Sequence, residues 1–163
     1  MSFDVFLSRF AAGDLAESPK QPVLDVIRSY PFTGPDKFGF YVLSLSGDDT
    51  VEVSAKGLES SKPFYGCALH IRRMNAGLSD LIYSLAQAGH LAIIPAMDDN
   101  PVFLVAEQME SELPPDMLKT HHLHFVSSAS ELAQGLGPGL QAWSDYRDHA
   151  VGSTPQKGGP TKR

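Results

Sequence analysis

The stretch from residue 78 to residue 106, LSDLIYSLAQAGHLAIIPAMDDNPVFLVA, decides the fold class. Residues 78–88 predict an amphipathic helix, because apolar side chains recur there at spacings of three and four residues. These side chains are Leu78, Leu81, Ile82, Leu85 and Ala86. Ser79 is predicted to cap the start of this helix, and Gly89 to close it in the left-handed conformation.

Two strands are predicted directly after this helix, at residues 90–94 and 102–106. A turn at residues 98–101, Asp-Asp-Asn-Pro, separates them. Both segments are apolar almost without interruption, which is typical of strands that are covered on both faces.

The residues before this stretch predict a strand, a helix and three further strands. Residues 3–10 alternate between apolar and polar side chains, and a helix opens near Pro22. Residues 38–45 and 51–55 flank a turn and predict a hairpin. Residues 64–74 predict a strand on which Cys67, Leu69 and Ile71 face one way, and Ala68, His70 and Arg72 the other.

The residues after it predict a last strand and a last helix. Residues 107–120 are expected to be irregular, or a helical turn broken at Pro114-Pro115, before a strand at 122–126. Ser128 and Glu131 have the spacing of a capping box. The cluster Gly135-Leu-Gly-Pro-Gly139 is expected to interrupt this helix, which resumes over 140–149.

The order β-α-β-β-β-α-β-β-β-α predicts an α+β fold, with two or three helices packed on a mainly antiparallel sheet. Residues 1–150 are expected to form a single domain. Residues 151–163 are expected to be a disordered basic tail, because they are rich in small and polar residues.

The charge balance is acidic. The chain of 163 residues carries a net charge of −6, and the tail holds three of its 13 basic residues and none of its 19 acidic ones. An acidic domain is repelled by nucleic acid phosphates and by anionic membranes, so neither is expected as a partner. The charge favours a cationic protein, although solubility alone also accounts for it.

Six acids lie between residues 98 and 116, where there is no Lys or Arg, and they are the candidate partner-binding residues. They are Asp98, Asp99, Glu107, Glu110, Glu112 and Asp116. The aromatic side chains Phe64, Tyr65 and Trp143 are candidates for apolar anchors or for core positions.

Reactive motifs are absent from the sequence. No phosphate-binding glycine loop or nucleophile elbow occurs, so no catalytic residue and no cofactor are predicted. His121, His122 and His124 lack an identifiable third ligand, so no metal site is predicted. Cys67 is the only cysteine, which excludes an intrachain disulfide, and it is expected to be a buried thiol. The first ten residues lack the basic start and the long apolar stretch that are typical of a signal peptide, and no apolar run is long enough to span a membrane, so a cytoplasmic location is expected.

Two alternatives to protein binding remain open at this point. An enzyme or small-ligand site could be assembled from distant residues, with His70, His90, Arg72 and Arg73 as candidates. The chain could instead associate with itself through an edge strand at residues 121–126.

Three strings carry a resemblance to a known group. They are MSFDVFLSRF at residues 1–10, LIYSLAQAGHLAIIP at 81–95 and LPPDM at 113–117. They resemble small bacterial proteins that begin M-S-F-D-V-x-L and that look like immunity proteins of bacterial toxin systems. The resemblance implies a non-enzymatic cytoplasmic protein that neutralises a cognate cationic toxin, and it supplies no catalytic residue.

Overall fold

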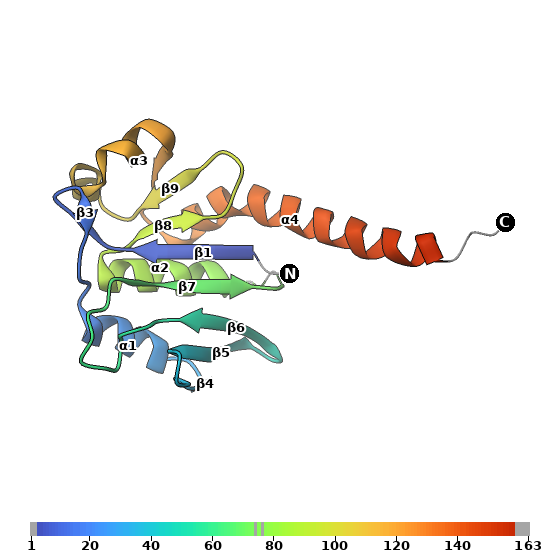
Figure 1. The fold of residues 1–163 in the computed structure, drawn as a ribbon, viewed down its shortest axis with the longest axis horizontal. Coiled ribbons are helices and arrows are strands. Elements are labelled where there is room, and N and C mark those ends of the chain that lie inside the picture. Colours follow the sequence, from blue (N-terminus) through green and yellow to red (C-terminus); the bar gives the residue numbers. More distant parts are fainter. Residues whose placement is uncertain (1–2, 74, 76, 159–163) are drawn as a thin grey trace.

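A mainly antiparallel sheet of eight strands organises the chain, and helices cover one of its faces (Figure 1). The computed structural model describes residues 3–73, 75 and 77–158. The strands of the sheet are β1 Phe3–Ser8, β4 Phe32–Thr33, β5 Phe40–Ser46, β6 Asp49–Ser54, β7 Gly66–Ile71, β8 Ala92–Pro95, β9 Pro101–Leu104 and β10 His122–Phe125. Their order across the sheet is β10-β9-β8-β1-β7-β6-β5-β4. The predicted α+β class is confirmed.

Three helices form the layer on the covered face (Figure 1): α1 Lys20–Arg28, α2 Leu78–Gly89 and α4 Ala129–Gly158. Helix α2 lies in the middle and contacts both α1 and α4. The main hydrophobic core fills the space between this layer and the sheet. A separate pair of short strands, β2 Phe10–Ala11 and β3 Asp14–Leu15, follows β1.

Strand β1 lies at the centre of the sheet and shows how alternation builds the core. Phe3, Val5 and Leu7 are buried against the helices. The antiparallel register with β7 sets Val5 opposite Leu69 and Leu7 opposite Cys67. The predicted core face of β7 is therefore confirmed, and the other residues of both strands point to the opposite face.

Strands β8 and β9 are covered on both faces, as predicted. On one face, Ile93 and Phe103 belong to the main core. On the other, Val102 and Leu104 pack in a smaller cluster with Leu113. This second cluster is covered by the 3-10 helix η1 Glu107–Glu112 and by the helix α3 Pro115–Thr120. Pro114-Pro115 thus separates two short helices, and β10 then pairs with β9 in parallel.

Helix α2 buries its predicted apolar side, but both of its ends differ from the prediction. Its N-cap is Gly77, with no side-chain hydrogen bond, so the prediction of Ser79 was wrong. The left-handed residue is His90, with φ 55°, and not Gly89. Gly89 is still helical and packs closely: a Cβ there would clash with Val23 and with Ser18, whose hydroxyl donates to the Gly89 carbonyl at 2.9 Å.

Helix α4 is continuous, so the predicted interruption at Gly135–Gly139 was wrong. The glycines allow close packing: a Cβ at Gly135 would overlap the Phe103 ring, and one at Gly139 would overlap Met97. One half of the predicted capping box is present, since the Ser128 hydroxyl accepts a hydrogen bond from the backbone N–H of Glu131 at 3.1 Å. The Glu131 carboxylate accepts the backbone N–H of Ser127 at 2.7 Å, one residue before the position that the box requires. The helix includes residues 151–158 of the segment predicted to be disordered, and residues 159–163 lie outside the described residues.

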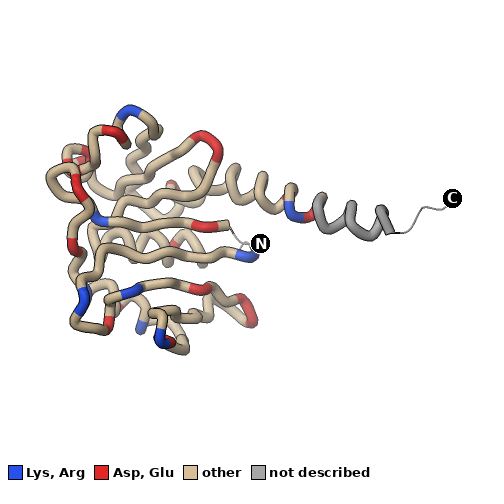
Figure 2. The backbone as a smooth tube through the Cα atoms, viewed as in Figure 1, with Lys and Arg blue, Asp and Glu red and all other residues tan. Residues whose placement is uncertain are grey.

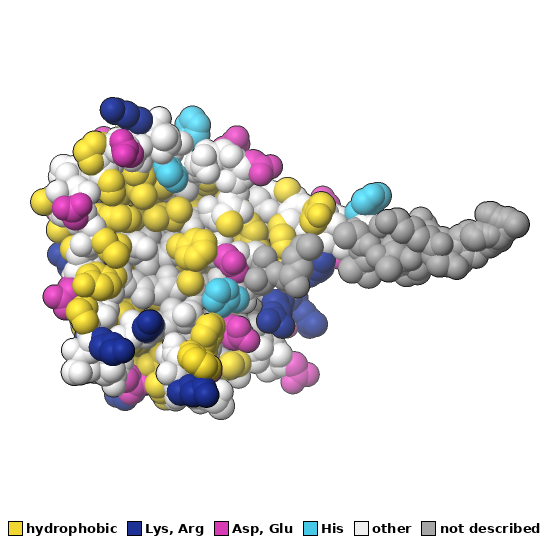
Figure 3. All heavy atoms as spheres, in the orientation of Figure 1, with side chains coloured by type: hydrophobic (Ala, Val, Ile, Leu, Met, Phe, Trp, Pro, Cys, Tyr) yellow, Lys and Arg dark blue, Asp and Glu magenta, His cyan; other side chains and the backbone are white. Residues whose placement is uncertain are grey.

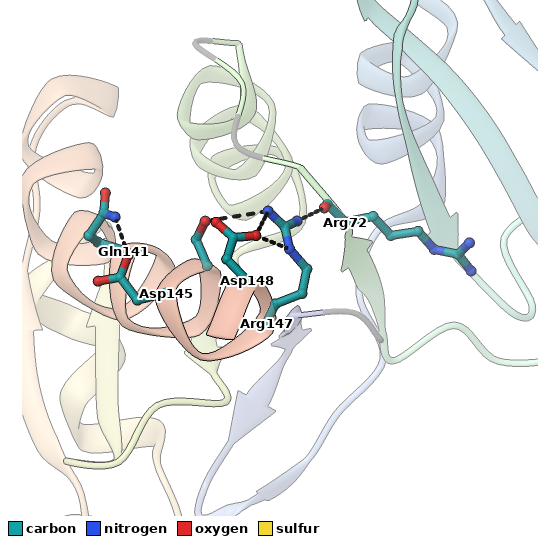
Figure 4. A network of polar contacts seen from close by, with 6 residues as sticks. Arg72, Gln141, Asp145, Arg147 and Asp148 are labelled. Atoms are coloured by element: carbon teal, nitrogen blue, oxygen red, sulfur yellow. Dashed lines mark hydrogen bonds and ion pairs between the residues drawn. The ribbon is translucent and has the colours of Figure 1, made fainter. Parts of the chain in front are cut away.

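Arg147 connects α4 to the residue that follows β7 through a hydrogen bond (Figure 4). Its guanidinium donates to the backbone carbonyl of Arg72 at 2.8 Å, pairs with Asp148 at 3.0 Å and lies over the Trp143 ring. Beyond this point α4 projects from the body of the molecule (Figure 1). No helix within the described ranges is both long enough and apolar enough to cross a membrane.

Candidate binding surface

The face of β1, β5, β6 and β7 that points away from the helices carries half-buried and exposed side chains, and Figure 3 views the molecule from this side. We refer to it as the open face. The antiparallel registers align its side chains in rows that run across the strands. One row contains Asp4 of β1, His70 of β7, Glu52 of β6 and Val42 of β5.

His70 lies between two carboxylates in this row. Its Nδ1 atom is 3.0 Å from Asp4 Oδ1, and Glu52 is its direct neighbour on the other side. Directly opposed residues of antiparallel strands have Cβ atoms about 4.5–5.5 Å apart. Among the described residues, nothing hydrogen-bonds to or ion-pairs with the Glu52 carboxylate.

A second row is mainly apolar. It contains Ile94 of β8, Phe6 of β1, Ala68 of β7, Ser54 of β6 and Phe40 of β5. Phe6 is 45% exposed, and the Phe40 ring centroid is 6.0 Å from that of His70. With Val42, which is 39% exposed, these side chains place apolar area beside the charged row.

The exposed Phe6 ring makes this face a candidate for protein binding, because aromatic residues are enriched in protein interfaces. Asp4, Phe6, Val42 and Glu52 were not predicted as site residues from the sequence. The signal that could have found them was Phe6, a large aromatic residue on the polar side of an alternating strand.

A cavity of about 530 Å³ lies next to the charged row. His70, Arg72 and Arg73 line it together with Glu52, so three of the four candidates for a site built from distant residues do gather. The Arg72 side chain points away from α4 (Figure 4). Arg73 is 3.5 Å from Asp49. The fourth candidate, His90, lies elsewhere, in a cavity that shares no lining residue with this one.

The six predicted partner-binding acids do not form one patch. Asp98 and Asp99 lie in the turn before β9, whereas Glu107, Glu110, Glu112 and Asp116 lie on η1 and α3 after it. Strand β9 runs between the two groups, and Figure 2 shows them apart. The Glu112 carboxylate accepts a hydrogen bond from the backbone N–H of Ala12 at 2.7 Å, so one of its oxygens already has a partner within the protein.

The three clustered histidines lie at one edge of the sheet. His122 and His124 belong to β10, the edge strand. His124 stacks on Phe103 with ring centroids 5.2 Å apart, and His121 Nδ1 is 2.9 Å from the Thr120 hydroxyl. Within residues 3–73, 75 and 77–158, no three His, Cys, Asp or Glu side chains gather closely enough to hold a metal ion.

The remaining candidates belong mostly to the core. Burial raises the pKa of the Cys67 thiol from 9.0 to about 12, which makes it a poor nucleophile. Phe64 is fully buried, and Trp143 packs against Phe3. Tyr65 is 41% exposed.

No protein-family model, curated protein or solved structure matches this chain.

Proposed function

We propose that this chain is a non-enzymatic protein-binding protein, and that its open face receives a partner with a basic surface. The observation that carries the proposal is the position of Phe6 and Val42, both well exposed, on either side of Glu52 and His70. A few side chains, often aromatic ones buried at the centre, contribute most of the affinity in protein interfaces, and Phe6 is the candidate for that role here.

The charge of the partner follows from the carboxylates of this surface. Glu52 has no partner among the described residues, and a half-buried carboxylate gains most from a Lys or Arg that excludes water. The chain as a whole has a net charge of −6, which would accelerate the approach of a basic protein. The split acidic groups at the two ends of β9 would act in this long-range attraction.

The more specific form of the proposal is a cytoplasmic immunity protein that neutralises a cognate cationic toxin domain. It is supported by the acidic charge and by the resemblance of the three sequence strings. Such a protein needs no catalytic group of its own, because blocking the toxin requires only tight binding.

The test uses basic toxin-like domains encoded beside the gene, with binding measured by isothermal titration calorimetry. Phe6→Ser removes the central aromatic ring and should weaken binding tenfold or more. Asp25→Lys on α1 is the matched control, because Asp25 is exposed on the helix layer. It should bind like the wild type once the general effect of charge has been suppressed at 0.3 M salt. Equal affinity of the Phe6→Ser variant would place the interface elsewhere.

The alternative, a site for a small ligand or a reaction, is favoured by one observation: His70, Arg72 and Arg73 share the cavity of about 530 Å³. Inorganic phosphate separates the two functions. A saturable phosphate-dependent shift of the His70 ring resonances that Arg72→Gln abolishes would support the small-ligand site. Unchanged resonances at 20 mM phosphate would leave protein binding as the better explanation.

A further inference from the structure

A second cavity, of about 350 Å³, lies where β1 ends, β8 begins and η1 passes over them. Phe10, Met109 and Leu113 form an apolar part of its wall. Figure 3 shows hydrophobic side chains gathered over this end of the sheet. An apolar wall with a few polar groups is the usual composition of a small-molecule site, and this volume is near the lower end of the usual range.

Two opposite charges line this cavity without pairing. Arg9 and Glu112 are both half-buried, yet no ion pair joins them in the described structure. The Arg9 guanidinium has no other hydrogen-bonding partner among the described residues. Glu112 is held at the wall because its Oε2 atom accepts the Ala12 N–H, which leaves Oε1 available.

Charged groups that lose part of their hydration are stabilised by a partner of opposite sign. Arg9 and Glu112 have opposite charges but form no ion pair with each other in the described part of the chain, and the apolar wall lies beside them. The arrangement therefore suits a molecule that carries an anionic group, a cationic group and an apolar body. A cavity of this volume limits that molecule to a small one.

We propose that this cavity binds a free apolar α-amino acid. Its carboxylate would pair with Arg9, which presents the fork geometry that suits carboxylates. Its ammonium would donate to Glu112, and its side chain would lie against Phe10, Met109 and Leu113. The inference goes beyond the proposed function, because none of these residues belongs to the open-face rows.

The methionine methyl groups allow a direct test by NMR with ¹³C-methyl-labelled methionine. Met109 lines this cavity, whereas Met97 lies against Gly139 of α4 and serves as an internal control. L-leucine is the probe, with 4-methylpentanoate and 3-methylbutylamine as analogues that lack the ammonium and the carboxylate. We expect a saturable shift at Met109, none at Met97, and at least tenfold weaker binding of each analogue.

Arg9→Gln and Glu112→Gln should each weaken leucine binding at least tenfold, because each removes one ionic contact. The side-chain amide introduced by Glu112→Gln can still accept the Ala12 N–H through its carbonyl oxygen, so this variant should keep its fold. Glu110→Gln, also on η1 but outside the cavity wall, should leave binding unchanged. The proposal is overturned if 20 mM leucine leaves Met109 unshifted, or if either analogue binds as tightly as leucine. The analogue comparison uses the wild-type protein and is decisive even if Arg9→Gln fails to fold.

Discussion

The two faces of one sheet differ in what their side chains contact. On β1, Leu7 is fully buried beneath the helix layer, whereas its neighbour Phe6 is 45% exposed on the open face. On β7, Leu69 is buried and His70 is half-buried between two carboxylates. In a strand that alternates in this way, every second residue belongs to the core and the others point to the opposite face of the sheet. Substitutions on the two faces should therefore have separable effects.

The largest expected difference is between Leu7→Ala and Phe6→Ala. Removing a fully buried Leu from a central strand costs about 2–5 kcal/mol of unfolding free energy, because a cavity remains. Phe6→Ala should cost less than about 1 kcal/mol, because nearly half of this side chain already contacts water. Urea unfolding followed by circular dichroism measures both. Equal losses would mean that the open face is part of the core.

The pH dependence of stability should sharpen the contrast within β7. In the unfolded chain the Cys67 thiol ionises near pH 9, whereas burial raises its pKa to about 12 in the folded protein. Between these values the unfolded state loses a proton that the folded state keeps, so stability falls as pH rises. The loss by pH 12 is at most about 4 kcal/mol from this group.

The Tyr41 pKa is also raised, first by burial and then by its hydrogen bond to Glu59 at 2.6 Å, and it adds a loss of the same sign. Cys67→Ala should therefore reduce the slope of stability against pH between pH 9 and 10.5 without removing it. Urea unfolding at several pH values provides the slopes. An unchanged slope would show that the thiol is not protected by burial.

The sequence predicts the covered face better than the open one, for a physical reason. Burial imposes apolar side chains at regular spacing, so the core residues of β1, β7 and α2 are readable from the chain alone. Glycine is ambiguous, because it both ends helices and permits close packing. At Gly135 and Gly139 the glycines allow α4 to continue and to pack closely against Phe103 and Met97. These contacts join segments that are distant in the sequence.

The candidate surface depends on register, which the sequence does not state. Asp4, His70 and Glu52 are far apart in the chain and meet only because β1, β7 and β6 are neighbours in the sheet. In the acidic stretch from Asp98 to Asp116, residues that are close in sequence lie apart in the fold, because β9 runs between them. Neither result follows from composition or periodicity.

Glu52→Lys tests whether a substitution on the open face changes the affinity for a partner without changing the free energy of unfolding. Association with a basic partner should weaken about tenfold at 0.05 M salt, and the difference should shrink at 0.5 M salt because ions screen the repulsion. The free energy of unfolding should change by less than about 1 kcal/mol, since Glu52 has no partner among the described residues. Calorimetry and urea unfolding measure the two quantities on the same preparation. A large loss of stability would make Glu52 a structural residue.

The smallest effect is expected for Arg73→Ala, at the rim of the open face. Arg73 is 79% exposed and its nitrogen lies 3.5 Å from Asp49, so the ion pair is well solvated. Exposed pairs of this kind contribute from almost nothing to about 1 kcal/mol, because water and salt weaken the attraction and the long side chain loses freedom. Asp49 also keeps its hydrogen bond from Asn75 at 2.6 Å after the substitution. Stability should thus change by less than about 0.5 kcal/mol in urea unfolding. A loss above about 1 kcal/mol would show that charges at this rim hold the β5–β6 hairpin in place, and the separation between a folding face and a binding face would then fail at its edge.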